Sequence, residues 1–162
     1  MNSNRTWAEL RQAVIDWASA RNFFGEGGAT FDGQLKKLCE EYGELALGLA
    51  RADQDEIDDA IGDCLVVLII LDRLNLSNTT VVLPFGALID FVAEITGIGN
   101  MNKAHRTVTI VMLLNCMVQW ADDFASDSHN YPNNSTYCLA VAYEQIKDRT
   151  GRFIDGVFVK DQ

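Results

Sequence analysis

Apolar residues recur every three or four positions along most of this chain, which is the spacing of helices that bury one face. The spacing predicts helices over residues 6–21, 34–52, 53–75, 85–96, 102–127 and 135–150, with Asp53 as the cap of the third. The glycine-rich stretch 22–33 is expected to be a loop. Residues 151–160 alternate instead, which predicts a short extended tail or a small hairpin. The expected fold class is therefore all-α, a helical bundle with a short extended C-terminal tail.

Length and composition limit the class of protein. A chain of 162 residues, 48% hydrophobic and 22% charged, fits one globular domain over residues 1–162. The net charge of −10 argues against binding to nucleic acid or to an anionic membrane. No segment reads as a signal peptide or a membrane span, and the four cysteines form no CxxC pair. These features predict a cytoplasmic protein with reduced thiols and no zinc site.

Two acidic segments stand on the second and third predicted helices. Positions three or four apart share one face of a helix, which gives two sets of acids: Glu40, Glu41 and Glu44, then Glu56, Asp59 and Asp63. Asp63 stands directly before residues 64–71, which are apolar on every side and are therefore expected to be buried. A carboxylate at this position is costly to desolvate unless a positive group meets it.

Nearby basic residues are too few to neutralise these acids. Lys36 and Lys37 lie one turn before Glu40 and Glu41 and cover only part of their charge. Facing helices with converging carboxylates repel each other unless a cation lies between them. Oxygen ligands select Mg²⁺, with Mn²⁺ as the alternative, over zinc or copper. The competing interpretation is a solvated acidic face or a helix N-terminus, but the position of Asp63 favours a metal site.

The acidic motifs resemble those of a known family. Glu40-Glu41-x-x-Glu44, followed after a gap by an acidic pair that ends in Asp63, is similar to the EExxE and ExxD motifs of the all-α MazG-like nucleoside triphosphate pyrophosphohydrolases. Residues 142–160 resemble the tail of the phage members of this family. The resemblance implies a MazG-like helical bundle of phage origin, which would act in the host cytoplasm.

The resemblance also implies a site for two or more Mg²⁺ ions. Its expected metal ligands are Glu41, Glu44, Asp59 and Asp63, and its expected catalytic carboxylates are Glu40, Glu41 and Glu44. One position departs from the family pattern, because Ala60 stands where ExxD has its glutamate. Asp59 shares a helix face with Asp63 and is the expected substitute. Glu56, two turns before Asp63, is the second choice.

The reaction implied by the family is the hydrolysis of a nucleoside triphosphate to its monophosphate and pyrophosphate. Water attacks the α-phosphorus, while the metal ions lower the pKa of that water and neutralise developing charge. A purine substrate such as dGTP is a candidate, and the expected assembly is a homodimer or homotetramer.

Substrate contacts are expected from basic and aromatic residues near the acidic motifs. The candidate phosphate ligands are Lys37, Lys147, Arg149 and Arg152, and the candidate base contacts are Trp17, Phe24 and Gln34. The alternative for Lys147, Arg149 and Arg152 is that they lie on a solvated surface. The alternative for the aromatic residues is that they belong to the core.

Other classes of protein fit the sequence less well. A ferritin-like bundle needs Glu-x-x-His pairs, and an HD-type phosphohydrolase needs a His-Asp pair. Neither pattern occurs, since His105 is followed by arginine and His129 by asparagine. The alternative from a different class is a non-catalytic helical interaction module with a solvated acidic face, which predicts no dependence on metal ions.

Overall fold

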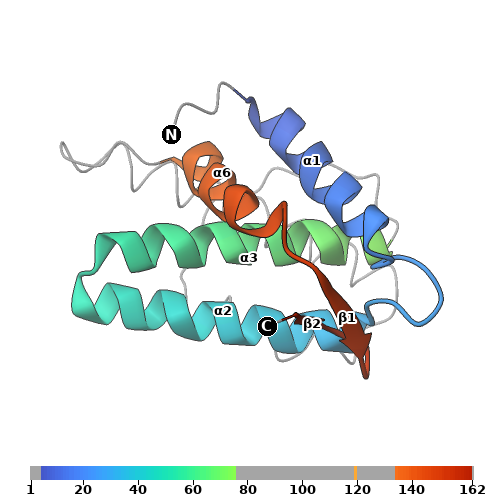
Figure 1. The fold of residues 1–162 in the computed structure, drawn as a ribbon. Coiled ribbons are helices and arrows are strands. Elements are labelled where there is room, and N and C mark those ends of the chain that lie inside the picture. Colours follow the sequence, from blue (N-terminus) through green and yellow to red (C-terminus); the bar gives the residue numbers. More distant parts are fainter. Residues whose placement is uncertain (1–4, 76–118, 120–133, 162) are drawn as a thin grey trace.

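The computed structural model describes residues 5–75, 119 and 134–161. Its elements, in chain order, are α1 (Trp7–Ala20), α2 (Phe31–Arg51), α3 (Gln54–Asn75), α6 (Ser135–Ile146), β1 (Gly151–Ile154) and β2 (Val157–Lys160) (Figure 1). The described part is therefore mostly helical and ends in a small antiparallel sheet of two strands. The helices predicted over residues 85–96 and 102–127 lie outside the described residues.

Helix α3 is the element on which the other three described helices pack. Helix α2 runs antiparallel beside it, and α1 and α6 lie across its other side (Figure 1). Every residue from 64 to 71 is at most 6% exposed, which confirms the expectation that this apolar run is buried. Gly62 allows α6 to approach closely, because a Cβ atom at this position would lie 2.3 Å from the carbonyl oxygen of Cys138.

The first two helices bury the stripes that their spacing predicts. Leu10, Val14 and Trp17 of α1 are buried, and so are Leu38 and Leu45 of α2. No helix among the described residues is long and apolar enough to span a membrane.

The described cysteines are free thiols, in agreement with the prediction. Cys64 and Cys138 are buried and Cys39 is exposed. Cys116 lies outside the described residues.

Helix α2 begins earlier than the predicted residue 34. Thr30 is its N-cap, because its side-chain oxygen accepts a hydrogen bond from the backbone N–H of Gly33 at 3.0 Å. Gly33 is therefore part of the first turn of the helix and not of the loop. The start of α3 agrees with the prediction, since Asp53 accepts from the backbone N–H of Glu56 at 3.2 Å.

Helix α6 ends at Ile146, earlier than the predicted residue 150. The side chain of Arg21 holds the turn that follows, because it donates hydrogen bonds to the backbone carbonyls of Lys147 at 2.9 Å and Arg149 at 2.6 Å. The chain turns here and forms the two strands, so the alternating segment is a hairpin and not a single extended tail.

Candidate active site

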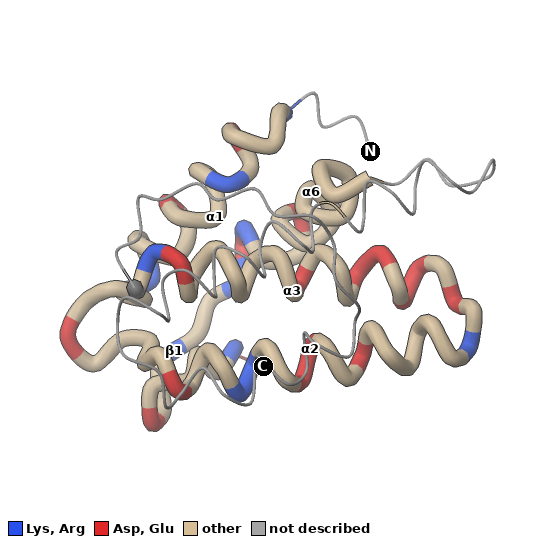
Figure 2. Tube along the Cα trace, turned by 180° about the vertical axis from the view of Figure 1, so that it is seen from behind, with Lys and Arg blue, Asp and Glu red and all other residues tan. Residues whose placement is uncertain are grey.

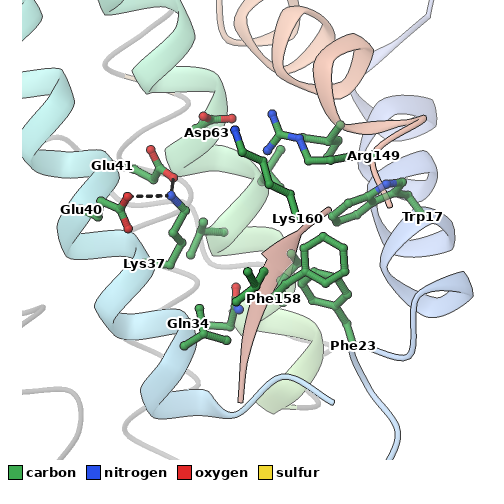
Figure 3. A pocket seen from close by; sticks show the side chains of 16 residues that line it. Trp17, Phe23, Gln34, Lys37, Glu40, Glu41, Asp63, Arg149, Phe158 and Lys160 are labelled. Carbon is green, nitrogen blue, oxygen red and sulfur yellow. Dashed lines mark ion pairs between the residues drawn. The ribbon is translucent and has the colours of Figure 1, made fainter. Parts of the chain in front are cut away.

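A pocket of about 410 Å³ opens between α2, α3, the turn after α6 and the C-terminal hairpin (Figure 3). Its acidic lining residues are Glu40, Glu41 and Asp63, and its basic ones are Lys37, Arg149 and Lys160. The opposite wall is aromatic and is formed by Trp17, Phe23 and Phe158, with Gln34 beside it (Figure 3). The pocket thus combines both signs of charge with a flat apolar surface.

Glu41 is the buried acid of α2. Its side chain is only 3% exposed and pairs with the ammonium of Lys37 at 2.5 Å, while Lys37 also reaches the exposed Glu40 at 3.2 Å. Burial raises the pKa of Glu41, and the charges of Glu44 and Glu40 add to this effect, against the opposing influence of Lys37. Lys37 therefore neutralises Glu41 only in part.

Asp63 faces the pocket from α3 without a partner that neutralises it. Its side chain forms no hydrogen bond or ion pair with the described residues, although Arg149 and Lys37 lie near enough to influence it. Burial raises the pKa of Asp63 to about 7, and the charges of Glu41 and Asp59 contribute to this increase. Helices α2 and α3 therefore present two carboxylates to one pocket at a cost in electrostatic energy.

The remaining predicted metal ligands lie around this pair and not in the lining of the pocket. Glu44 is exposed on α2 and acts on Glu41 only through its charge. Asp59 accepts a hydrogen bond from Gln145 at 2.6 Å, and Glu56 pairs with Arg51 at 3.0 Å. Acidic positions are spread along both helices (Figure 2). Among the described residues, however, no group of three acidic, histidine or cysteine side chains lies close enough to hold a metal ion by itself.

The four predicted phosphate ligands fall into two groups. Lys37 and Arg149 line the pocket. Lys147 and Arg152 are exposed and do not line the pocket. Lys147 pairs with Glu144 at 2.5 Å, whereas Arg152 on β1 forms no ion pair with the described residues. Lys160 of β2 lines the pocket although the sequence analysis did not select it. Only its place in the alternating segment could have drawn attention to it.

Two of the three predicted base contacts, Trp17 and Gln34, line the pocket and are buried. The third, Phe24, lies outside its lining and packs near Arg73, whose guanidinium carbon is 5.8 Å from the ring centroid. The aromatic wall is completed by Phe23 and Phe158, with ring centroids 5.1 Å apart. The buried indole nitrogen of Trp17 has no hydrogen-bond partner among the described residues.

Arg21 connects the aromatic wall to the basic side of the pocket, and the sequence analysis did not identify it. Its guanidinium carbon lies 5.0 Å from the centroid of the Trp17 ring, and its nitrogens bind the carbonyls of Lys147 and Arg149. Because Arg is planar and carries several donors, one side chain stacks on the ring and fixes the turn at once. Arg21 thereby positions both Trp17 and Arg149.

Fold and site together define a mostly helical protein with a pocket in which carboxylates, cations and an aromatic wall meet. Over 71 residues, the chain is 42% identical to an uncharacterized 18.2 kDa protein from the rep–hol intergenic region of Haemophilus phage HP1. The match covers 42% of this chain and 42% of the phage protein, so less than half of that relative's length is spanned. No family model and no solved structure matches the chain. The similarity agrees with the expected phage origin and names no activity.

Proposed function

We propose that this protein is a MazG-like helical enzyme that hydrolyses nucleoside triphosphates to monophosphates and pyrophosphate with the help of Mg²⁺. The observation that carries the proposal is the pair Glu41 and Asp63, which faces the pocket from two neighbouring helices. The pKa of each is raised by burial and by the charge of nearby acids. A divalent cation relieves this repulsion, and the acidic chain of net charge −10 needs such a cation to accept a triphosphate.

Glu41 and Asp63 suit the way in which proteins commonly hold Mg²⁺. This ion usually takes one or two carboxylates and completes its shell with water and substrate phosphates, so a cage of protein ligands is not required. Glu44 and Asp59, which lie outside the lining of the pocket, would add negative charge near Glu41 and Asp63. Glu56 is the alternative to Asp59. When bound, two or more such ions, or Mn²⁺ in their place, would activate water and neutralise the charge that develops on the phosphates.

The other pocket residues have roles that follow from their positions. Arg149 has no ion pair or side-chain hydrogen bond with the described residues, which leaves its guanidinium for a phosphate. Lys37 can exchange its ion pair with Glu41 for a phosphate contact once that charge is met by a cation. Glu40, whose side chain is 60% exposed at the rim, can orient the attacking water.

The aromatic wall supports a proposal for the base. Trp17 and Phe158 offer flat apolar surfaces on which a base can stack. The amide of Gln34 can then hydrogen-bond to the edge of that base. A purine has the larger stacking surface, so dGTP remains a candidate. We also propose that the protein acts in the host cytoplasm as a homodimer or homotetramer.

Product analysis by chromatography tests the proposed reaction. The purified protein is incubated with each common NTP and dNTP, with and without MgCl₂. We expect a monophosphate and pyrophosphate in equal amounts and only with Mg²⁺. The variants Glu41→Gln and Asp63→Asn should lose turnover by at least about a hundredfold, because each removes a carboxylate on which the metal site depends. We expect the same loss for Glu44→Gln, because Glu44 contributes negative charge beside Glu41.

Two matched variants control for a general effect of losing an acid. Glu26→Gln changes an exposed loop residue, and Asp16→Asn changes an exposed residue of α1, so both should keep full turnover. Full activity of Asp63→Asn would contradict the assigned site. If the folded protein turned over no nucleotide with Mg²⁺ or Mn²⁺, the proposal would fail, and the non-catalytic interaction module would become the better interpretation.

A further inference from the structure

The C-terminal hairpin forms one wall of the pocket and is held in place by contacts with the rest of the fold. Its turn lies against the start of α2, where the backbone N–H of Thr30 donates a hydrogen bond to the carbonyl oxygen of Gly156 at 3.1 Å. A Cβ atom on Gly33 would lie only 2.6 Å from the same oxygen, so this close approach requires a glycine at residue 33. Gly156 has a φ of 78°, which suits glycine at a tight turn.

Aromatic contacts hold the two strands against α1 and the following loop. Phe153 and Phe158 lie on opposite strands and face each other in register. Their ring centroids lie 4.9 Å and 5.1 Å from that of Phe23, and Phe158 is also 6.0 Å from Trp17. The hairpin is therefore held at three places. Arg21 binds the turn that precedes β1, the phenylalanine rings contact the strands, and Thr30 binds the hairpin turn at Gly156.

This arrangement brings Lys160 to the charged side of the pocket. Lys160 ends β2 opposite Gly151, at the end of the hairpin away from the turn. Its side chain and that of Arg149 extend toward the part of the pocket where Glu41 and Asp63 lie (Figure 3). Neither cation forms an ion pair or a side-chain hydrogen bond within the described part of the chain, whereas Lys37 is held by Glu40 and Glu41.

Two cations without a partner at one end of a pocket indicate an anionic ligand, particularly in a chain with a net charge of −10. We propose that Lys160 binds the phosphate chain of the substrate together with Arg149, an inference that rests on the proposed function. The fixed hairpin presents the ammonium of Lys160 from the side opposite α2. The phosphates are thus held between Lys37 on one wall and Lys160 and Arg149 on the other.

Arg152 is the matched control for Lys160, because the structure places this predicted phosphate ligand outside the lining of the pocket. It belongs to the same hairpin, carries the same charge and is exposed, as Lys160 is. Lys160→Met removes the ammonium and keeps an unbranched apolar side chain, and Arg152→Met makes the equivalent change outside the pocket. Lys160→Arg restores the charge and shows whether a loss arises from charge or from altered packing.

The test measures binding of imidodiphosphate, a pyrophosphate analogue that resists hydrolysis, by calorimetry in MgCl₂, and the KM of the preferred nucleotide. Loss of a charge-assisted hydrogen bond is expected to raise both the Kd and the KM by about tenfold in Lys160→Met. Arg152→Met should match the wild-type protein, and Lys160→Arg should recover most of the loss. Thermal unfolding and circular dichroism establish that each variant is folded.

The outcomes separate this inference from the proposed function. If the wild-type protein hydrolyses nucleotides but Lys160→Met and Arg152→Met give equal Kd and KM values, the role of Lys160 is overturned and the proposed function stands. If no nucleotide is hydrolysed, the proposed function fails and the calorimetry alone decides the role of Lys160. Absence of imidodiphosphate binding by the wild-type protein would overturn the inference in either case.

Discussion

At the scale of single residues, two aspartates at the ends of one buried run have opposite surroundings. Asp72 follows the apolar segment of α3, is 4% exposed and pairs with Arg11 at 2.6 Å. Asp63 precedes the same segment and has no such partner among the described residues. A buried acid that is paired is satisfied, whereas a partly buried acid that faces other carboxylates is held at an energetic cost. This difference supports the proposal that Asp63, and not Asp72, is a metal ligand.

The raised pKa of Asp63 predicts how stability depends on pH when metal ions are removed by chelation. Its pKa is about 7 in the folded protein and 3.8 when unperturbed, so the folded state holds the proton more tightly. This contribution to stability is complete below the lower pKa and is lost as the pH rises through the higher one. Asp63→Asn removes this pH dependence. Between about pH 5 and pH 8, the free energy of unfolding of the variant should therefore rise relative to that of the wild-type protein by on the order of 1–3 kcal/mol.

Urea unfolding at a series of pH values measures this difference. Asp16→Asn serves as the control, because Asp16 is exposed on α1 and should leave the pH dependence unchanged. A parallel pH profile for Asp63→Asn and the wild-type protein would show that burial does not perturb this carboxyl group.

The residues of the site were predictable to the extent that helical spacing alone decides which side chains are neighbours. Glu41, Asp63 and Lys37 were found in this way, and all three line the pocket. Lys160 and Arg21 were not found, because their positions depend on contacts between distant segments. Arg21 binds the carbonyl of Arg149, 128 residues away, and the hairpin that carries Lys160 docks on Thr30. Spacing within one helix carries no information about such contacts.

At the scale of elements, the contacts between helices determine where glycine is required. Gly62 faces α6, where an added Cβ atom would lie 2.3 Å from the carbonyl oxygen of Cys138 and 2.8 Å from the Cβ of Ala142. Gly43 stands in the interior of α2, and an added Cβ atom would meet nothing within 4 Å. Helical spacing within α2 and α3 does not distinguish these two situations.

The same substitution at these two positions should therefore have opposite effects. Gly62→Ala forces α3 and α6 apart and should lower the free energy of unfolding by about 1–3 kcal/mol. Gly43→Ala restricts the unfolded chain without a clash and should raise it by about 0.5–1 kcal/mol. Chemical denaturation of both variants measures the two effects. Equal changes in the same direction would contradict the close packing of α3 on α6.

The lengths of the elements show what local sequence can and cannot decide. The start of α3 agrees with the prediction because its cap, Asp53, is a neighbour in sequence. The end of α6 differs from the prediction, and the turn that follows it is held by Arg21, which is far away in sequence and binds the carbonyls of Lys147 and Arg149. The start of α2 differs although its cap, Thr30, is also a neighbour in sequence, because Gly33 of the first turn looks like a loop residue.

At the scale of the whole molecule, charge distinguishes the proposed enzyme from an interaction module. The chain carries a net charge of −10, and part of that charge is directed into a pocket instead of being spread over solvated faces. A cation bound between Glu41 and Asp63 would stabilise the folded state alone. A solvated acidic surface would gain only the weak screening that any salt provides.

Thermal unfolding in MgCl₂ and in NaCl of equal ionic strength tests this distinction. We expect Mg²⁺ to raise the Tm beyond the effect of NaCl, with a stabilisation of about 2.7 kcal/mol when the ion is at a hundredfold excess over its Kd. The gain should disappear in Glu41→Gln and Asp63→Asn, and it should persist in Glu26→Gln. The same Tm in the two salts would argue for the interaction module.

The origin of the pocket walls has a consequence for the synthesis of the protein. Both central carboxylates belong to the first 75 residues, whereas Arg149 and Lys160 follow more than 70 residues later. Once α2 and α3 have been synthesised, the acids and Lys37 of the site are present, but Arg149 and Lys160 are not. During translation, the nascent chain first carries the facing carboxylates without the pocket wall that Arg149 and the hairpin form. The proposed site is therefore complete only after the hairpin has been synthesised and has docked.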